Sequence, residues 1–178
     1  MKLLNRPIWR VPVVLIGLGI TNRLLTFLLS FLWVHIQKAQ GPNPETGAYE
    51  ISSGAITAVL AVIAFVLFWA AGWKFIRGLT RKQIFLSATI MVVWHGILLA
   101  LEQWTMATSN WDLYFAWVYR LWITVDGTGW ASQLLFRIFG EVSVPVVLPS
   151  IFTPYLYILL GRSSVSTQET DFAESEPT

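Results

Sequence analysis

Long apolar stretches separated by short polar segments dominate the hydrophobicity pattern of this chain. A transmembrane helix needs about 20 predominantly apolar residues to cross about 30 Å of hydrocarbon. Four stretches meet this requirement, at residues 11–36, 54–76, 83–105 and 139–161. The pattern therefore predicts an all-α integral membrane protein, in which residues 1–162 form a bundle of four transmembrane helices.

A shorter apolar segment at residues 111–125 separates the third and fourth predicted spans. On a regular helix, Trp111, Phe115 and Trp122 share one face, whereas Arg120 lies elsewhere on the helical wheel. This pattern is typical of an amphipathic helix that lies in the membrane interface. A fifth span is the alternative, but the segment is short for a crossing.

Composition supports a membrane protein. Of the 178 residues, 55% are hydrophobic and only 12% are charged, and the mean hydropathy is +0.60. A soluble domain carries about 25% charged residues, so the composition excludes an ordinary soluble protein and a fully disordered chain. The chain has no cysteine, which excludes disulfides, thiolate metal sites and cysteine nucleophiles.

Basic residues are distributed unequally between the two ends of the predicted bundle. Eight lie at the end that holds both termini: Lys2, Arg6, Arg10, Lys74, Arg77, Arg81, Lys82 and Arg162. Three lie at the other end: Lys38, Arg120 and Arg137. Because Lys and Arg collect in cytoplasmic loops, we expect a cell-membrane protein with both termini in the cytoplasm. Residues 163–178 are acidic and rich in Ser and Thr, and predict a disordered cytoplasmic tail.

Ionisable residues inside predicted spans are the candidate functional groups, because each is costly in hydrocarbon. Arg23 lies about 18 Å into the first span, close to the membrane midplane, and His95 lies at a similar depth in the third. Glu102 follows His95 by two turns on the same face, and Arg137 and Glu141 can pair along one helix. These five residues form the predicted polar cluster, with Glu102 as the first candidate partner of Arg23 and Glu141 as the second. Either the cluster is an ion pair that fixes helix order, or it is a ligand or proton site.

Three prolines interrupt the last predicted span. Pro145, Pro149 and Pro154 each remove a backbone donor and disturb the helix before them. The pattern indicates either a kink packed against neighbouring helices or a hinge of the kind found in transporters.

No sequence motif names a reaction, and no stretch resembles a known family. We expect a non-enzymatic membrane protein that transports, senses or scaffolds, with no cofactor, no metal and no nucleic-acid partner. Its expected partners are the lipid bilayer and either a larger membrane protein or a second copy. The alternative is an enzyme that acts on a lipid or isoprenoid near the outer leaflet, with His95, Glu102 and Glu141 as acid–base groups.

Overall fold

All regular elements in the described part of the chain are helices. The computed structural model describes residues 6–42, 47, 49, 54–122, 127–140 and 148–162. In chain order the elements are α1 Pro7–Ala39, α2 Gly54–Phe75, α3 Arg81–Ala107, α4 Trp111–Leu113, the π-helix η1 Tyr114–Val118, α5 Tyr119–Trp122, α6 Gly129–Phe139 and the 3₁₀ helix η3 Leu148–Leu160. The predicted all-α class is confirmed for these residues.

Three of the helices, α1, α2 and α3, are long and apolar enough to cross a membrane. They coincide with the first three predicted spans. Few α2 residues are buried, namely Ala64, Phe68 and Gly72. A helix that is apolar on every side but buries so little of itself suits a lipid environment.

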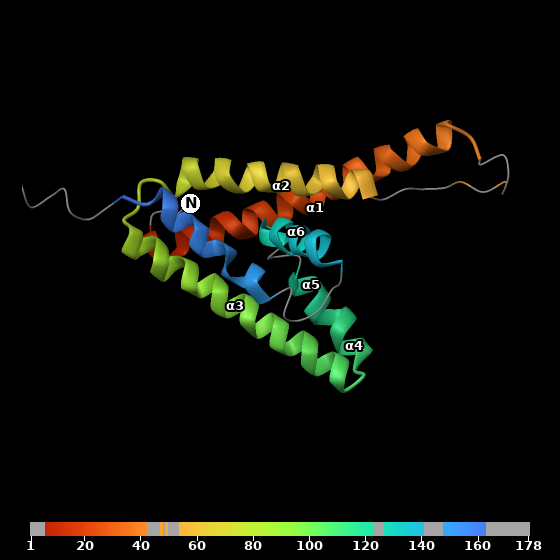
Figure 1. Ribbon diagram of the computed structural model, residues 1–178. Coiled ribbons are helices and arrows are strands. Elements are labelled where there is room, and N and C mark those ends of the chain that lie inside the picture. Colours follow the sequence, from red (N-terminus) through yellow and green to blue (C-terminus); the bar gives the residue numbers. More distant parts are fainter. Residues whose placement is uncertain are drawn as a thin grey trace, which may run out of the picture.

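The three long helices diverge from one end of the molecule. The α1 helix packs against both α2 and α3, and α2 and α3 spread apart from the turn that joins them, with α5 and α6 between them (Figure 1). The hydrophobic core lies near the turn and includes Leu15, Phe68, Ile76 and Ile84. Beyond Asn22, α1 has no buried residue, so its second half presents apolar side chains outward.

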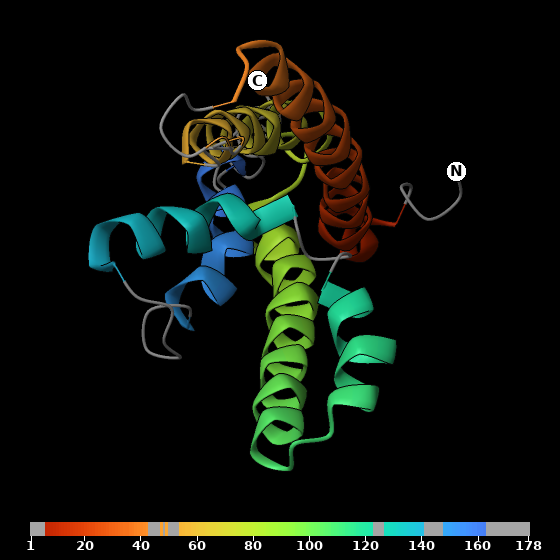
Figure 2. The ribbon, with the colours of Figure 1, turned by 90° about the vertical axis from the view of Figure 1, so that its right-hand side faces the viewer.

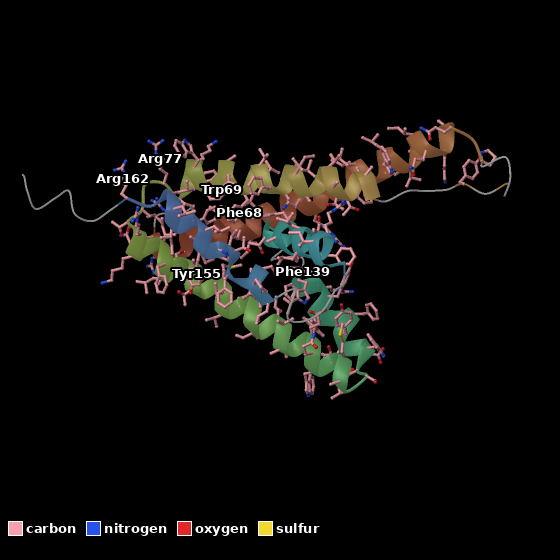
Figure 3. All side chains as sticks on the ribbon, in the orientation of Figure 1. Phe68, Trp69, Arg77, Phe139, Tyr155 and Arg162 are labelled. Carbon is pink, nitrogen blue, oxygen red and sulfur yellow. The ribbon has the colours of Figure 1, made fainter. Side chains whose placement is uncertain are left out.

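The end of η3 forms backbone hydrogen bonds with the α2–α3 turn and the start of α3. Thr80 begins α3 with a capping box, in which its Oγ1 accepts from the Gln83 N–H at 3.3 Å and the Gln83 side chain accepts from the Thr80 N–H at 3.1 Å. Arg162 N–H donates to Leu79 O, and Arg81 N–H donates to Arg162 O. Arg77 and Arg162 consequently lie at the same end of the molecule (Figure 3).

The start of α1 is fastened to α3 at that end through a proline defect. Pro12 has no N–H, so it cannot donate to the carbonyl of Ile8 four residues earlier. Ser87 of α3 supplies the missing donor, because its hydroxyl donates to Ile8 O at 2.7 Å. The Ser87 Oγ also accepts a hydrogen bond from Val11 N–H at 3.1 Å. Ser87 is fully buried, so this contact is shielded from solvent.

The segment predicted as an interfacial helix is helical over residues 111–122 and runs antiparallel to α3, alongside it (Figure 2). After residues 123–126, which lie outside the described residues, Gly127 packs against the α1 backbone. A Cβ there would lie 2.6 Å from Leu15 O, so glycine allows this close approach. The chain then returns along α2, and Trp130 contacts Phe65 and Phe68 at centroid distances of 4.9 and 5.6 Å.

Two described elements overlap the last predicted span, 139–161, namely the end of α6 and the helix η3. The α6 helix ends at Phe139, and Gly140 adopts a left-handed conformation with φ 75° that terminates it. Residues 141–147, which include Glu141 and Pro145, lie outside the described residues. The next described element, η3, is a 3₁₀ helix of 13 residues, unusually long for this geometry. At about 2.0 Å per residue it extends about 26 Å, more than an α-helix of equal length.

The η3 helix is held against α2 by Tyr157. The Tyr157 ring stacks on Phe68 at a centroid distance of 4.2 Å, and its hydroxyl donates to Phe68 O at 3.0 Å. Gly72 makes this approach possible, because a Cβ there would collide with the Tyr157 ring. Tyr155 joins the same helix to α3, because its ring stacks on Phe85 at a centroid distance of 5.2 Å and its hydroxyl lies 3.0 Å from the Thr89 hydroxyl.

Replacing Ser87 by alanine should destabilise the protein by about 1–3 kcal/mol, because Ile8 O would lose its donor and the buried Val11 N–H would lose a hydroxyl acceptor. Pro12→Ala restores a donor for Ile8 O, so S87A should cost less in a P12A background than in the wild type. The measurement is the free energy of unfolding, or the melting midpoint, in detergent micelles. Ser132→Ala is the control, because the Ser132 hydroxyl bonds only within its own helix. Strict additivity of S87A and P12A would contradict this account.

Candidate functional site

Arg23 projects from the middle of α1 and contacts Tyr119 of α5. Its Nη2 donates to the Tyr119 hydroxyl oxygen at 3.1 Å, and its Cζ lies 5.9 Å from the centre of the Tyr119 ring. The side chain is exposed, whereas the neighbouring Asn22 is buried. The guanidinium is therefore held at the surface of the described bundle and is not enclosed within it.

Glu102 of α3 is tied to the same short helical segment. The Tyr114 hydroxyl donates to Glu102 Oε1 at 3.4 Å, and the rings of Tyr114 and Tyr119 lie 6.4 Å apart. Arg23, Tyr119, Tyr114 and Glu102 therefore follow one another from α1 to α3, and we call this set the tyrosine bridge. A direct pairing of Arg23 with Glu102 stays a prediction.

A π-turn explains how Tyr114 and Tyr119 come together. In a regular α-helix, residues five apart point in different directions, so a helical wheel separates Tyr119 from Tyr114. In η1 the Tyr119 N–H donates to Tyr114 O, the i→i+5 bond of a π-helix. This widened turn places Tyr119 one turn after Tyr114. Neither tyrosine is identified as a site residue from the sequence, because the residue pattern does not predict a π-turn.

His95 belongs to a different contact. It is 2% exposed and faces the backbone of Ile151 in η3, and its Nε2 has no hydrogen-bond partner within the described residues. Along α3 it lies about 10 Å from Glu102. The structure thus places His95 at the α3–η3 interface and Glu102 at the tyrosine bridge.

The two remaining members of the predicted cluster are Arg137 and Glu141. Arg137 Nη2 donates to Gly54 O at 2.8 Å, which ties the end of α6 to the start of α2. Glu141 lies outside the described residues. Among the residues that the structure describes, no three His, Asp or Glu side chains gather in a way that could hold a metal ion.

Chemically, the tyrosine bridge combines one fixed positive charge, two hydroxyls and one carboxyl group. The guanidinium can bind an anion, and the hydroxyls and carboxyl can donate or accept protons. The sequence matches no family model, and no curated protein or solved structure is significantly similar to it. The site is therefore interpreted from its own geometry and charge.

Replacing Tyr119 by phenylalanine should lower the melting midpoint, because Arg23 loses a hydrogen-bond acceptor. In a double-mutant cycle of Arg23→Gln and Tyr119→Phe, we expect a coupling of about 1 kcal/mol, which is below the range for buried charged donors because Arg23 is exposed. Tyr49→Phe is the matched control, because Tyr49 is also exposed and lies between α1 and α2. If the effects of R23Q and Y119F simply add, the contact contributes nothing and the bridge loses its first link.

Proposed function

We propose that the chain is a multi-pass protein of the cell membrane with both termini in the cytoplasm. The start of α1, the α2–α3 turn and the end of η3 lie at one end, where Arg10, Arg77 and Arg162 contribute to the excess of positive charge. In this arrangement η3 is the fourth crossing. Residues 111–122 enter the bundle from the opposite side, and α6 leads the chain back toward that side.

The short helices between α3 and η3 resemble the interrupted segments that form binding sites in membrane proteins. Irregular backbone at membrane depth is tolerated only where protein covers it or where it lines a cavity, and such segments form binding sites in transporters. Here the returning segments place Tyr119 beside Arg23 and Gly127 against α1.

We propose that Arg23 is the counter-charge for a small anionic or amphipathic ligand, and that the protein transports or senses this ligand. The observation that carries the proposal is the Arg23–Tyr119 contact, which holds a guanidinium midway along a membrane-length helix. Placing an arginine at such a depth costs about 2.5–3.5 kcal/mol of insertion free energy, and residues placed at this cost usually have a functional role. Glu102, linked through Tyr114, would fix the register of the segment or take up a proton.

Scaffolding is a less specific form of the same proposal. The second half of α1 exposes apolar side chains, among them Phe27, Phe31 and Ile36, which would face lipid, a larger membrane protein or a second copy. An enzyme acting on lipid would need His95 and Glu102 to converge, and the described contacts of these two residues are with different elements.

Cysteine labelling tests the topology without background, because the chain has no cysteine of its own. We expect Tyr49→Cys to react with a membrane-impermeant maleimide in intact cells. Gly78→Cys in the α2–α3 turn and Ser166→Cys in the tail should react only after lysis. If Gly78→Cys and Ser166→Cys label from opposite faces of the membrane, η3 is not a crossing and the proposed topology is wrong.

Ligand binding is tested by the melting midpoint of the purified protein in chloride, acetate or phosphate, against gluconate at equal ionic strength. A bound anion raises the midpoint by mass action, and we expect at least one of the three to do so. Arg23→Gln should abolish the rise and Arg23→Lys should keep part of it. Arg120→Gln, which removes an equal charge from the residue after Tyr119, should leave it unchanged.

Anion flux into proteoliposomes then separates a transporter from a sensor, because only a transporter carries the stabilising anion across. The anion-site proposal fails if none of the three anions raises the midpoint. It fails equally if R23Q keeps the full rise, or if R120Q abolishes the rise as R23Q does.

A further inference from the structure

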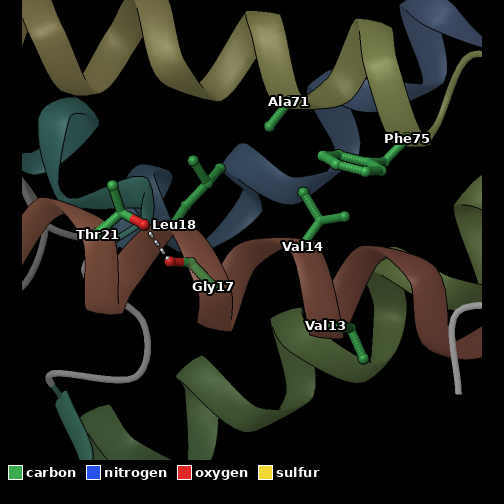
Figure 4. Close-up of a pocket in the computed structure, with 7 residues that line it drawn as sticks. All are labelled: Val13, Val14, Gly17, Leu18, Thr21, Ala71 and Phe75. Atoms are coloured by element: carbon green, nitrogen blue, oxygen red, sulfur yellow. Dashed lines mark hydrogen bonds between the residues drawn. The ribbon is translucent and has the colours of Figure 1, made fainter. Parts of the chain in front are cut away.

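A groove of about 270 Å³ runs between α1 and α2, on the half of the bundle nearer the basic end. Its α1 wall includes Val14, Gly17 and Leu18, and its α2 wall consists of Ala71 and Phe75 (Figure 4). The Phe75 ring reaches across the gap toward Val14 in the same view. Gly17 is exposed and Phe75 is 43% exposed, so the groove opens on the outer surface of the bundle.

The groove offers hydrocarbon contacts and almost no hydrogen bonds. Thr21 is its only polar lining side chain, and the Thr21 hydroxyl already donates to Gly17 O at 2.9 Å. A Cβ at Gly17 would meet no atom within 4 Å, so the glycine leaves room in the wall. An engineered apolar cavity of about 150 Å³ stays dry and takes up benzene. A larger groove without free polar groups therefore suits an apolar chain.

Positive charge lies at one end of this groove. The Lys74 Nζ lies 5.5 Å from the centre of the Phe75 ring, so an ammonium stands directly at the groove wall. Arg10 precedes Val14 by one turn of α1. Arg77 stacks on Trp73, with its Cζ 4.2 Å from the ring, on the same stretch of α2. Basic residues beside the hydrocarbon region attract anionic head groups.

We propose that this groove holds one acyl chain of an anionic phospholipid whose phosphate lies against Lys74 and Arg10. From Val13 to Thr21 the groove follows α1 for about 12 Å, which accommodates the upper part of an acyl chain. Charge favours a lipid over a second copy of this chain. In a symmetric dimer through the groove, each copy would bring its own basic end to the interface, where like charges repel.

The acyl-chain site is tested on the purified full chain by native mass spectrometry in an equimolar mixture of phosphatidylglycerol and phosphatidylcholine. Gly17→Leu fills the groove, and we expect it to reduce retained lipid about tenfold. Gly96→Leu is the matched control, because Gly96 of α3 also has no atom within 4 Å of an added Cβ and lies away from the groove. It should retain lipid as the wild type does.

The head-group site is tested in the same mixture. The wild type should retain phosphatidylglycerol over phosphatidylcholine by about fivefold, the preference expected for one basic residue near a head group. Lys74→Gln should remove this preference, whereas Lys82→Gln, at the start of α3 near the same end, should keep it.

Equal lipid retention by G17L and the wild type would overturn the proposal. So would equal retention of the two lipids by the wild type, or a preference that survives K74Q. The same spectra report the oligomeric state. If G17L converts a dimer to a monomer without changing retained lipid, the groove joins two copies and holds no acyl chain.

Discussion

The constraint on which the structure depends is that backbone polar groups in an apolar environment must find partners within the protein. Long helices satisfy it internally, and the exceptions are closed by side chains from other helices. The Ser87 hydroxyl replaces the donor that Pro12 removes, and it joins α3 to the start of α1. The buried Tyr157 hydroxyl finds its acceptor in the α2 carbonyl of Phe68, and this bond joins η3 to α2. These polar contacts therefore determine which helices are neighbours, whereas apolar surface alone would allow many arrangements.

The same constraint shapes the site. The segment that carries Tyr114 and Tyr119 is too short to cross a membrane as a helix, and it is stabilised by packing along α3 and by the Arg23 contact. Its π-turn costs regular hydrogen bonding, and single π-turns of this kind occur often at functional sites. In this protein the π-turn lets Tyr119 contact an arginine on α1 while Tyr114 contacts a glutamate on α3.

The two proposed sites lie at different levels of the bundle and use opposite chemistry. The tyrosine bridge is polar and centred on Arg23, whereas the groove between α1 and α2 is apolar and begins near Lys74. Both involve α1, and Thr21 of the groove is only two residues before Arg23. A lipid in the groove would therefore contact the helix that presents the candidate counter-charge.

The sequence by itself determined the helical class, the three long helices and the gathering of basic residues at one end. Each of these follows from local composition, because a run of about 20 apolar residues forms its own hydrogen bonds wherever it packs. Only the tertiary structure decided that Arg23 meets Tyr119, that His95 faces η3, and that Gly140 ends α6 where the last predicted span begins. A helical wheel assumes 3.6 residues per turn, so it could not reveal contacts made by a π-turn and a 3₁₀ helix. Those irregular turns persist because neighbouring helices supply the hydrogen bonds and packing that the local sequence lacks.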